Sequence, residues 1–295
     1  MALAQTMEGV DAVALPAPIA PSRFSSLEAS TPAREGELSS SVRLGALGQP
    51  VVLGVPGPSL DGGTSPAVAG LLLLELTAAY GLPHGFDVGL GLGLHAYQWG
   101  AGTSALDGSS SLDPVAFTDP RLAIGWARTF GDFSVRPYAQ LFVPFGDPAA
   151  FSGEGAVRGD LGIAASHRFD FMWLALDLGV RLREERTLGA TRLGTQLRAG
   201  LGALVSIGEH LGVGPELVVQ PNLASQAAPL DGEAGSLVPA QLRGTLRYEL
   251  GTSIVLLSAG SGLPFSRSSS LTGSQAVRGL TSPTWLAMAE LRTHF

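Results

Sequence analysis

Apolar and polar residues alternate along most of this chain after its first 38 residues. The clearest example is FMWLALDLGVRL, residues 171–182, where leucine or valine occupies every second position from 174 onward. A period of two places successive side chains on opposite faces of a β-strand. The pattern predicts twelve strands, at residues 41–54, 67–80, 86–99, 119–129, 132–145, 155–166, 170–183, 193–206, 210–220, 238–248, 251–260 and 284–295.

The connections between these strands alternate strictly between short and long. Five are tight turns, such as TFGD and IGEH, and six are longer segments rich in Gly, Ser, Asp and Pro. This asymmetry is typical of outer-membrane barrels, which have short periplasmic turns and longer extracellular loops. Because twelve is an even number, the pattern predicts that both termini are periplasmic.

The two faces of the strands differ in composition, and the difference indicates which face lines a water-accessible lumen. One face is mostly Leu, Val and Ala, whereas the other alternates glycine with isolated charged residues, as in DVGLGLGLHAYQW, residues 87–99. A soluble β-sandwich, the alternative fold, would carry many mixed charges and few glycines on its outer face. A glycine-rich face suits a confined lumen, the apolar face suits lipid, and only a closed sheet satisfies strand hydrogen bonds in hydrocarbon. We therefore predict an all-β fold, a closed antiparallel transmembrane β-barrel over residues 39–295.

Composition supports this fold and excludes several function classes. Only 15% of the 295 residues are charged, against about a quarter in soluble domains, yet no apolar run reaches the roughly twenty residues of a spanning helix. The net charge of −7 and the absence of a basic stripe argue against nucleic-acid binding. The chain has no cysteine, which argues against a disulfide, a thiolate metal site and a lipoprotein anchor. We expect no cofactor and no metal.

The first 38 residues form a separate region rich in Pro, Ala and Ser, without periodicity. This composition predicts a flexible or extended arm. Residues 1–4 resemble the small-residue end of a secretory signal whose earlier part has been removed, which indicates export. The arm is able to enter the lumen, or to dock a periplasmic or envelope-complex partner.

Several stretches resemble a known family. FTDPRLAIGW (117–126), FSGEGAVRGD (151–160), LGTQLRAGLG (193–202), LGVGPELV (211–218) and LTSPTWLAMAEL (280–291) are similar to the N-terminal barrel module of OmpA-family outer-membrane proteins of delta-type (myxobacterial) bacteria. The resemblance covers most of residues 40–295 and implies the outer membrane of a Gram-negative bacterium, with its lipid and lipopolysaccharide as surroundings. In that family a peptidoglycan-binding domain follows the barrel, and this sequence ends at Phe295 without one.

The last strand resembles the signal by which barrel-assembly machinery recognises its clients. Its alternating apolar positions include Trp285 and Leu291, and the chain ends on Phe295. We therefore expect the assembly machinery as a partner during biogenesis.

The polar face of the strands supplies the candidate site residues. Nine arginines and six carboxylates are predicted to face the lumen, and isolated charges in a barrel interior are costly unless they are paired or hydrated. We therefore expect pairs across strands. The predicted lumen-facing residues are Arg43, Glu75, Asp87, His95, Arg121, Arg136, Tyr138, Gln140, Arg158, Asp160, Asp177, Arg181, Gln196, Arg198, Glu216, Arg243, Arg247, Glu290 and Arg292.

Two functions are compatible with such a lumen. In the first, the charges line a narrow porin-like channel for small solutes, with a slight bias toward anions. In the second, they bridge and fill the lumen, so that the barrel is a non-conducting structural component of an envelope machine for secretion, export or gliding motility. Twelve strands lie between the filled eight-stranded barrel and the open porin. The glycines of residues 86–99 and the small residues Ala123, Gly125 and Ala127 favour open space, and thus the channel.

No catalytic pattern accompanies these residues. The chain contains neither Gly-x-Ser-x-Gly nor His-Glu-x-x-His. His95 lies well within a strand but on its inward face, unlike the lipid-facing histidine of outer-membrane phospholipases. We therefore predict that the protein is not an enzyme.

Overall fold

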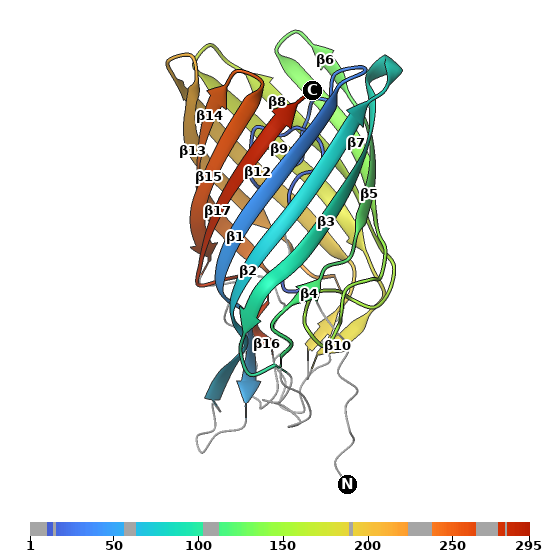
Figure 1. Cartoon of the computed structure of the whole chain (residues 1–295), viewed down its shortest axis with the longest axis vertical. Helices are drawn as coiled ribbons and strands as arrows, with labels where there is room; N and C mark the ends of the chain where they lie inside the picture. Colours follow the sequence, from blue (N-terminus) through green and yellow to red (C-terminus); the bar gives the residue numbers. More distant parts are fainter. Residues whose placement is uncertain are drawn as a thin grey trace.

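The computed structural model describes residues 11–13, 16–55, 63–102, 112–188, 191–223, 238–263, 277–280 and 282–295. These residues form a closed antiparallel barrel of twelve principal strands (Figure 1), so the predicted fold class is confirmed. The strands are β1 (Leu38–Val55), β2 (Gly63–Gly81), β3 (Phe86–Trp99), β5 (Arg121–Trp126), β7 (Phe133–Phe142), β8 (Arg158–Arg168), β9 (Met172–Leu182), β12 (Gln196–Ile207), β13 (Leu211–Val219), β14 (Ala240–Leu250), β15 (Ser253–Gly262) and β17 (Trp285–His294).

The barrel closes where its last strand meets its first. β17 pairs with β1 from Ser39 opposite His294 to Gly48 opposite Trp285. Beyond this ladder the main chains of Leu38 and Phe295 exchange two hydrogen bonds, of 3.2 and 2.9 Å. The C-terminal strand therefore offers no free edge for pairing with another chain.

The remaining described elements are short, and they account for the differences from the predicted strands. They are β4 (Ala116–Phe117), β6 (Arg128–Phe130), β10 (Arg186–Leu188), β11 (Thr191–Leu193), β16 (Val277–Leu280) and a 3₁₀ turn, η1 (Pro83–Gly85). The strand predicted at 119–129 is split into β5 and β6. The strand predicted at 193–206 begins only at Gln196, because Leu193 belongs to the β10–β11 hairpin, where it is fully buried.

The two ends of the barrel differ, as the lengths of the connections predicted. At the turn end, Gly131, Gly208 and Gly251 adopt positive φ angles of 60–66°, which glycine reaches without steric cost. Phe295 and the start of β1 lie at this end, at the top of Figure 1. The longer connections lie at the opposite, loop end. Among the described residues, no helix is long and apolar enough to cross a membrane.

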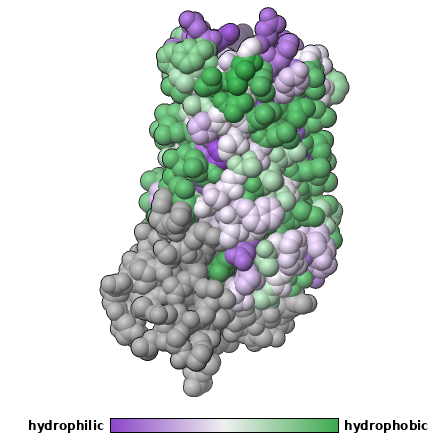
Figure 2. Space-filling view, turned by 90° about the vertical axis from the view of Figure 1, so that its left-hand side faces the viewer, coloured by the Kyte–Doolittle hydropathy of each residue, from purple (hydrophilic) through white to green (hydrophobic). Residues whose placement is uncertain are grey.

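The outer wall is apolar over most of its height. Leu174, Leu176 and Leu178 on β9 are 38–48% exposed, and apolar residues cover much of the wall in Figure 2, with polar residues gathered at the turn-end rim. Near the loop end, the Trp285 ring covers Gly48, where an added Cβ would lie 2.2 Å from the indole nitrogen. Such aromatic residues are typical of the interfacial belt of a membrane barrel.

Candidate functional site: the lumen and its N-terminal arm

All nineteen predicted lumen-facing residues point into the barrel. Each is at most 8% exposed, whereas alternate residues on the same strands are exposed on the outer wall. His95 is among them, and its Nδ1 lies 3.1 Å from Oε1 of Gln98. The side chains of Trp285, Leu291 and Phe295 are exposed on the outside, and their role in assembly stays a prediction.

Three charged residues of the loop end were missed by the sequence analysis. Glu154 forms ion pairs with Arg158, at 2.6 Å, and with Arg183, at 2.9 Å. Asp119 accepts hydrogen bonds from the main chain of Phe145 and Gly146. Glu154 escaped notice because it lies outside the predicted strands, where period-two reasoning assigns no face, whereas Asp119 was the first residue of a predicted strand and precedes the observed β5 by two residues.

The wall charges pair along the wall between neighbouring strands. Arg43 on β1 lies between Glu75 on β2, at 3.3 Å, and Glu290 on β17, at 3.1 Å. Arg181 binds both oxygens of Asp160 on β8, at 2.9 and 2.8 Å. The expected cross-strand pairs are therefore present, and they join strands that are adjacent or two apart along the wall rather than spanning the lumen.

Glycines of the inner face make room for the longer pairs. Arg136 on β7 passes over Gly125 on β5 to bind Asp87 on β3 at 2.6 and 2.9 Å. An added Cβ at Gly125 would lie 2.3 Å from the guanidinium group. Glycine on the inner wall thus leaves room for a long side chain from a neighbouring strand.

The N-terminal segment lies inside this lumen. We call its described residues, 11–13 and 16–37, the arm. At the loop end, Asp11 pairs with Arg158 at 2.7 Å, and the main-chain N–H of Ala12 donates to Phe151 at 2.8 Å. At the turn end, Gly36 donates to the carbonyl of Gly81 at 3.0 Å. The arm therefore runs the length of the barrel interior, where it appears as the dark blue trace in Figure 1.

The carbonyl groups of the arm accept hydrogen bonds from wall arginines. Arg121 donates to Ala17 at 2.9 Å, and Arg136 donates to Ala29 at 3.4 Å. Arg292 donates to two further arm carbonyls and Arg43 to one. These wall arginines thus pair with carboxylates along the wall and also donate to arm carbonyls on their inner side. The arm therefore satisfies N–H groups that would otherwise need water as a partner.

The N–H groups of the arm donate to wall carboxylates. Glu216 accepts from the main chain of both Ser25 and Ser26, each at 2.8 Å, and also from their hydroxyl groups. Glu75 accepts from Ala17 at 3.0 Å, and Asp177 accepts from Glu28 at 3.2 Å. Hydrogen bonds to charged groups are the stronger class in proteins, so these contacts fix the position of the arm.

Apolar arm residues fill the space that wall glycines leave. Phe24 and Leu27 form a buried cluster with Leu204 and Val218. An added Cβ at Gly202 would lie 2.5 Å from the Phe24 ring. Likewise, an added Cβ at Gly89 would lie 2.2 Å from Ile19. The glycines of β3 were interpreted as favouring open space, and the structure fills the space over Gly89 with the arm.

The charges in the barrel interior nearly balance when the arm is present. Among the described residues, those that are charged and buried as whole residues comprise nine arginines and ten carboxylates, and two of these carboxylates, Asp11 and Glu28, belong to the arm. The wall and loops alone therefore hold nine buried arginines against eight buried carboxylates.

A polar cavity of about 430 Å³ remains at the turn end, beside the arm. The guanidinium group of Arg23 stacks over the Trp173 ring, 3.9 Å from its centre, and Arg168 lies 5.4 Å from the same ring. Arg23 also lies 3.7 Å from Glu249. The arm thus contributes directly to the mouth of the lumen.

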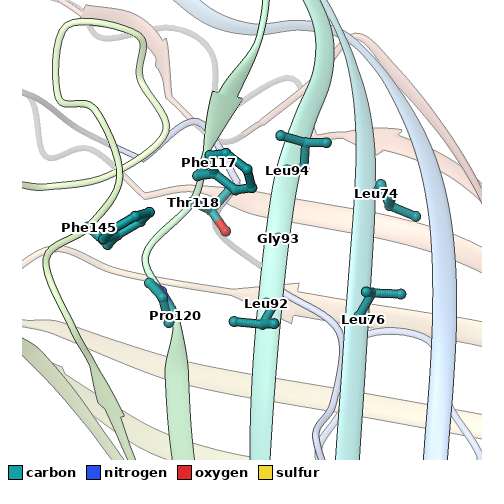
Figure 3. Close-up of a pocket in the computed structure, with 9 residues that line it drawn as sticks. All are labelled: Leu74, Leu76, Leu92, Gly93, Leu94, Phe117, Thr118, Pro120 and Phe145. Atoms are coloured by element: carbon teal, nitrogen blue, oxygen red, sulfur yellow. The ribbon is translucent and has the colours of Figure 1, made fainter.

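An apolar groove of about 430 Å³ lies beside β3, where residues 118–120 separate β4 from β5 (Figure 3). Phe117 and Phe145 meet edge to face at 6.2 Å between ring centres. Thr118 and Pro120 keep the wall continuous, since the N–H of Thr118 donates to Gly93 and the carbonyl of Pro120 accepts from Val143, each at 2.9 Å. The lining is almost entirely apolar, which suits hydrocarbon rather than a polar solute.

The positions of the chain ends follow from this arrangement. Phe295 lies at the turn end, whereas the arm from Asp11 begins at the loop end. As far as residue 11, the two ends are therefore at opposite ends of the barrel. The proposed signal remnant, residues 1–4, lies outside the described residues.

Comparisons with known proteins agree on the fold. No protein-family model and no curated protein matches the chain. Its structure is similar to that of an outer-membrane channel from Pseudomonas putida F1, with a TM-score of 0.60 and 14% identity over 90% of this chain and 98% of that one. It is also similar to the NanC porin, with a TM-score of 0.53 and 9% identity over 86% of this chain and 98% of that one. At these identities the likeness shows the fold alone, and the resemblance to OmpA-family barrels stays a prediction.

Proposed function

We propose that this protein is an outer-membrane channel for small solutes, closed in the described state by its own arm. The observation that carries the proposal is the position of the arm, which follows the lumen from Phe151 at the loop end to Gly81 at the turn end. Its main-chain groups form hydrogen bonds with wall arginines and carboxylates, which would face an open lumen without the arm. The fold likeness to two outer-membrane channels supports the same function.

The membrane setting belongs to this proposal. The apolar wall faces outer-membrane lipid and lipopolysaccharide, the turn end with Phe295 faces the periplasm, and the assembly machinery recognises the last strand. The protein performs no catalysis. With the arm displaced, nine wall arginines against eight carboxylates give the open lumen a slight preference for anions.

A reversible tether of the arm tests the proposal. Ser30 on the arm and Ser166 on β8 have hydroxyl oxygens 2.6 Å apart, so cysteines at both positions are close enough for a disulfide. The natural chain has no cysteine, and the pair S30C/S166C is therefore the sole crosslink. The matched control is S41C/T77C, whose hydroxyl oxygens are 2.7 Å apart on β1 and β2, and which joins two wall strands without holding the arm.

The readout is single-channel current in planar bilayers, with and without a reductant. We expect oxidised S30C/S166C to show no current steps and to gain them on reduction, whereas the control behaves alike in both states. Equal currents from oxidised and reduced S30C/S166C would show that the arm does not close the lumen.

The alternative is a non-conducting structural barrel in an envelope machine. The density of contacts between arm and wall favours it, since Glu216 alone binds two arm residues through both main chain and side chain. A partner would then dock on the loops, or on the arm after its withdrawal. This alternative predicts no current steps in either redox state, and periplasmic proteins that co-purify with the full chain but not with a chain lacking residues 1–38.

A further inference from the structure

The wall holds the arm largely through main-chain atoms, and this has a consequence for what else the lumen binds. We propose that the open lumen takes short peptides, of which the arm is the resident example. The inference rests on the proposed channel function and names its solute class. It follows from three features of the inner wall: arginines that meet carbonyl groups, carboxylates that meet N–H groups, and a socket for apolar side chains.

The carbonyl contacts come from four wall arginines on four different strands. Arg121 and Arg136 reach Ala17 and Ala29, and Arg43 and Arg292 together reach three carbonyls between residues 22 and 25. None of these five bonds depends on the identity of the arm side chain. Any peptide lying in the same direction offers the same acceptors.

The N–H contacts are equally independent of sequence. Glu75, Asp177 and Glu216 accept from four main-chain N–H groups of the arm, at 2.8–3.2 Å. Glu216 is 1% exposed and receives two consecutive N–H groups, one on each carboxylate oxygen. Glu216 thus binds a pair of consecutive N–H donors, which a polypeptide main chain supplies whatever its side chains.

The socket adds a preference for side chains. Phe24 and Leu27, three residues apart, pack over Gly200 and Gly202, where an added Cβ would lie 2.5 Å from Leu27 and Phe24 respectively. The two residues between them are serines bound to Glu216. The preferred peptide therefore has apolar residues at its first and fourth positions and small residues between them.

Oligosaccharides are the competing class, because their hydroxyl groups also bind arginine and carboxylate. They have no side chain to fill the socket over Gly200 and Gly202, and they offer no pair of consecutive N–H donors to Glu216. The contacts that the wall makes therefore favour peptides.

The experiment frees the lumen after the full chain has folded. Residues 34–36 are exposed at the turn end, so a specific protease site is inserted between Glu35 and Gly36 and cut in the assembled barrel. The released arm is removed by dialysis, and its loss is checked by mass spectrometry. Planar-bilayer current is then titrated with acetyl-Phe-Ser-Ser-Leu-amide, the sequence of residues 24–27, with the same peptide N-methylated at both serines, and with maltotetraose.

We expect the unmodified peptide to block the current at a concentration at least about tenfold lower than the N-methylated peptide, because methylation removes two hydrogen bonds to a charged group. Glu216→Gln in the cut chain should raise the blocking concentration. Asp160→Asn should leave it unchanged, because Asp160 binds only wall arginines.

Each remaining outcome has a defined meaning. Equal block by the two peptides overturns the inference, and so does block by maltotetraose without block by the peptide. In both cases the current itself leaves the channel function standing. A cut and arm-free chain that carries no current overturns the channel function instead.

Discussion

Replacing Gly202 by valine is expected to expel the arm and open the channel. Gly202 lies on the inner face of β12, and a Cβ at this position would lie 2.5 and 2.7 Å from atoms of Phe24 and Leu27. Contacts below 3 Å are not tolerated, so either the wall or the arm must move. The wall is held by ladders to β9 and β13 on both sides, and the arm therefore yields.

The size of the effect follows from the burial of the two displaced side chains, which are 3% and 1% exposed. Removing a buried phenylalanine from a core costs roughly 3–5 kcal/mol, and a buried leucine roughly 2–5 kcal/mol. Partial relaxation of the arm reduces the combined loss. A remaining loss of about 3 kcal/mol still raises the ratio of open to closed molecules about a hundredfold.

The assay is the open probability of single channels, with Gly244→Val as the matched control. Gly244 faces the outside on β14, and nothing lies within 4 Å of a Cβ added there. Gly244→Val should therefore behave like the natural chain. If Gly202→Val forms a folded barrel with the same open probability as Gly244→Val, the packing of the arm over Gly202 does not hold the channel closed.

Three further predictions concern acid stability, assembly and selectivity. Burial raises the pKa of Glu154, but its two arginine partners outweigh this and lower it from 4.5 to about 2. The stability that this carboxylate adds is thus complete above pH 4.5 and lost as the pH falls toward 2. The difference in melting temperature between the natural chain and Glu154→Gln should shrink over that range, and a constant difference would contradict this. Phe295→Ala should lower the yield of barrel assembled in cells, seen as heat-modifiable mobility on gels, more than Phe171→Ala does at another exposed site of the turn end. Arg243→Gln, in the chain cut after residue 35, should shift the reversal potential toward cations, since it leaves eight wall arginines against eight carboxylates, and an unchanged potential would refute the charge argument.

The barrel was predictable from sequence because each strand shows its alternation within a few neighbouring residues. A stretch such as β9 alternates over eleven residues. Whether a side chain faces the lumen or the outside depends only on whether its position in the strand is odd or even. The bounds failed where parity stops being informative, as at Leu193, which enters a loop hairpin. The same reasoning placed Arg43 and Glu216 inside but assigned no face to Glu154.

The detailed packing of the arm was not predictable from patterns of neighbouring residues. Its partners lie far away in sequence, with Ser25 and Glu216 separated by 191 residues. Most of its polar contacts use main-chain atoms, which leave no residue signature. The glycines at 89, 200 and 202 were the available signal, because small residues leave space on the inner face. The sequence did not show which side chains fill that space.

The arm also orders events during the making of the protein. Its contacts reach β2, β9, β13 and β17, so its binding site does not exist until nearly all the wall has formed. Contacts between residues as distant as Ser22 and Arg292, 270 positions apart, form slowly because a long loop must close first. On the proposed channel function, a wall that closes before the arm has entered would leave the lumen open for that interval. The leak in that interval would last only until residues 11–13 and 16–37 have taken their places in the lumen.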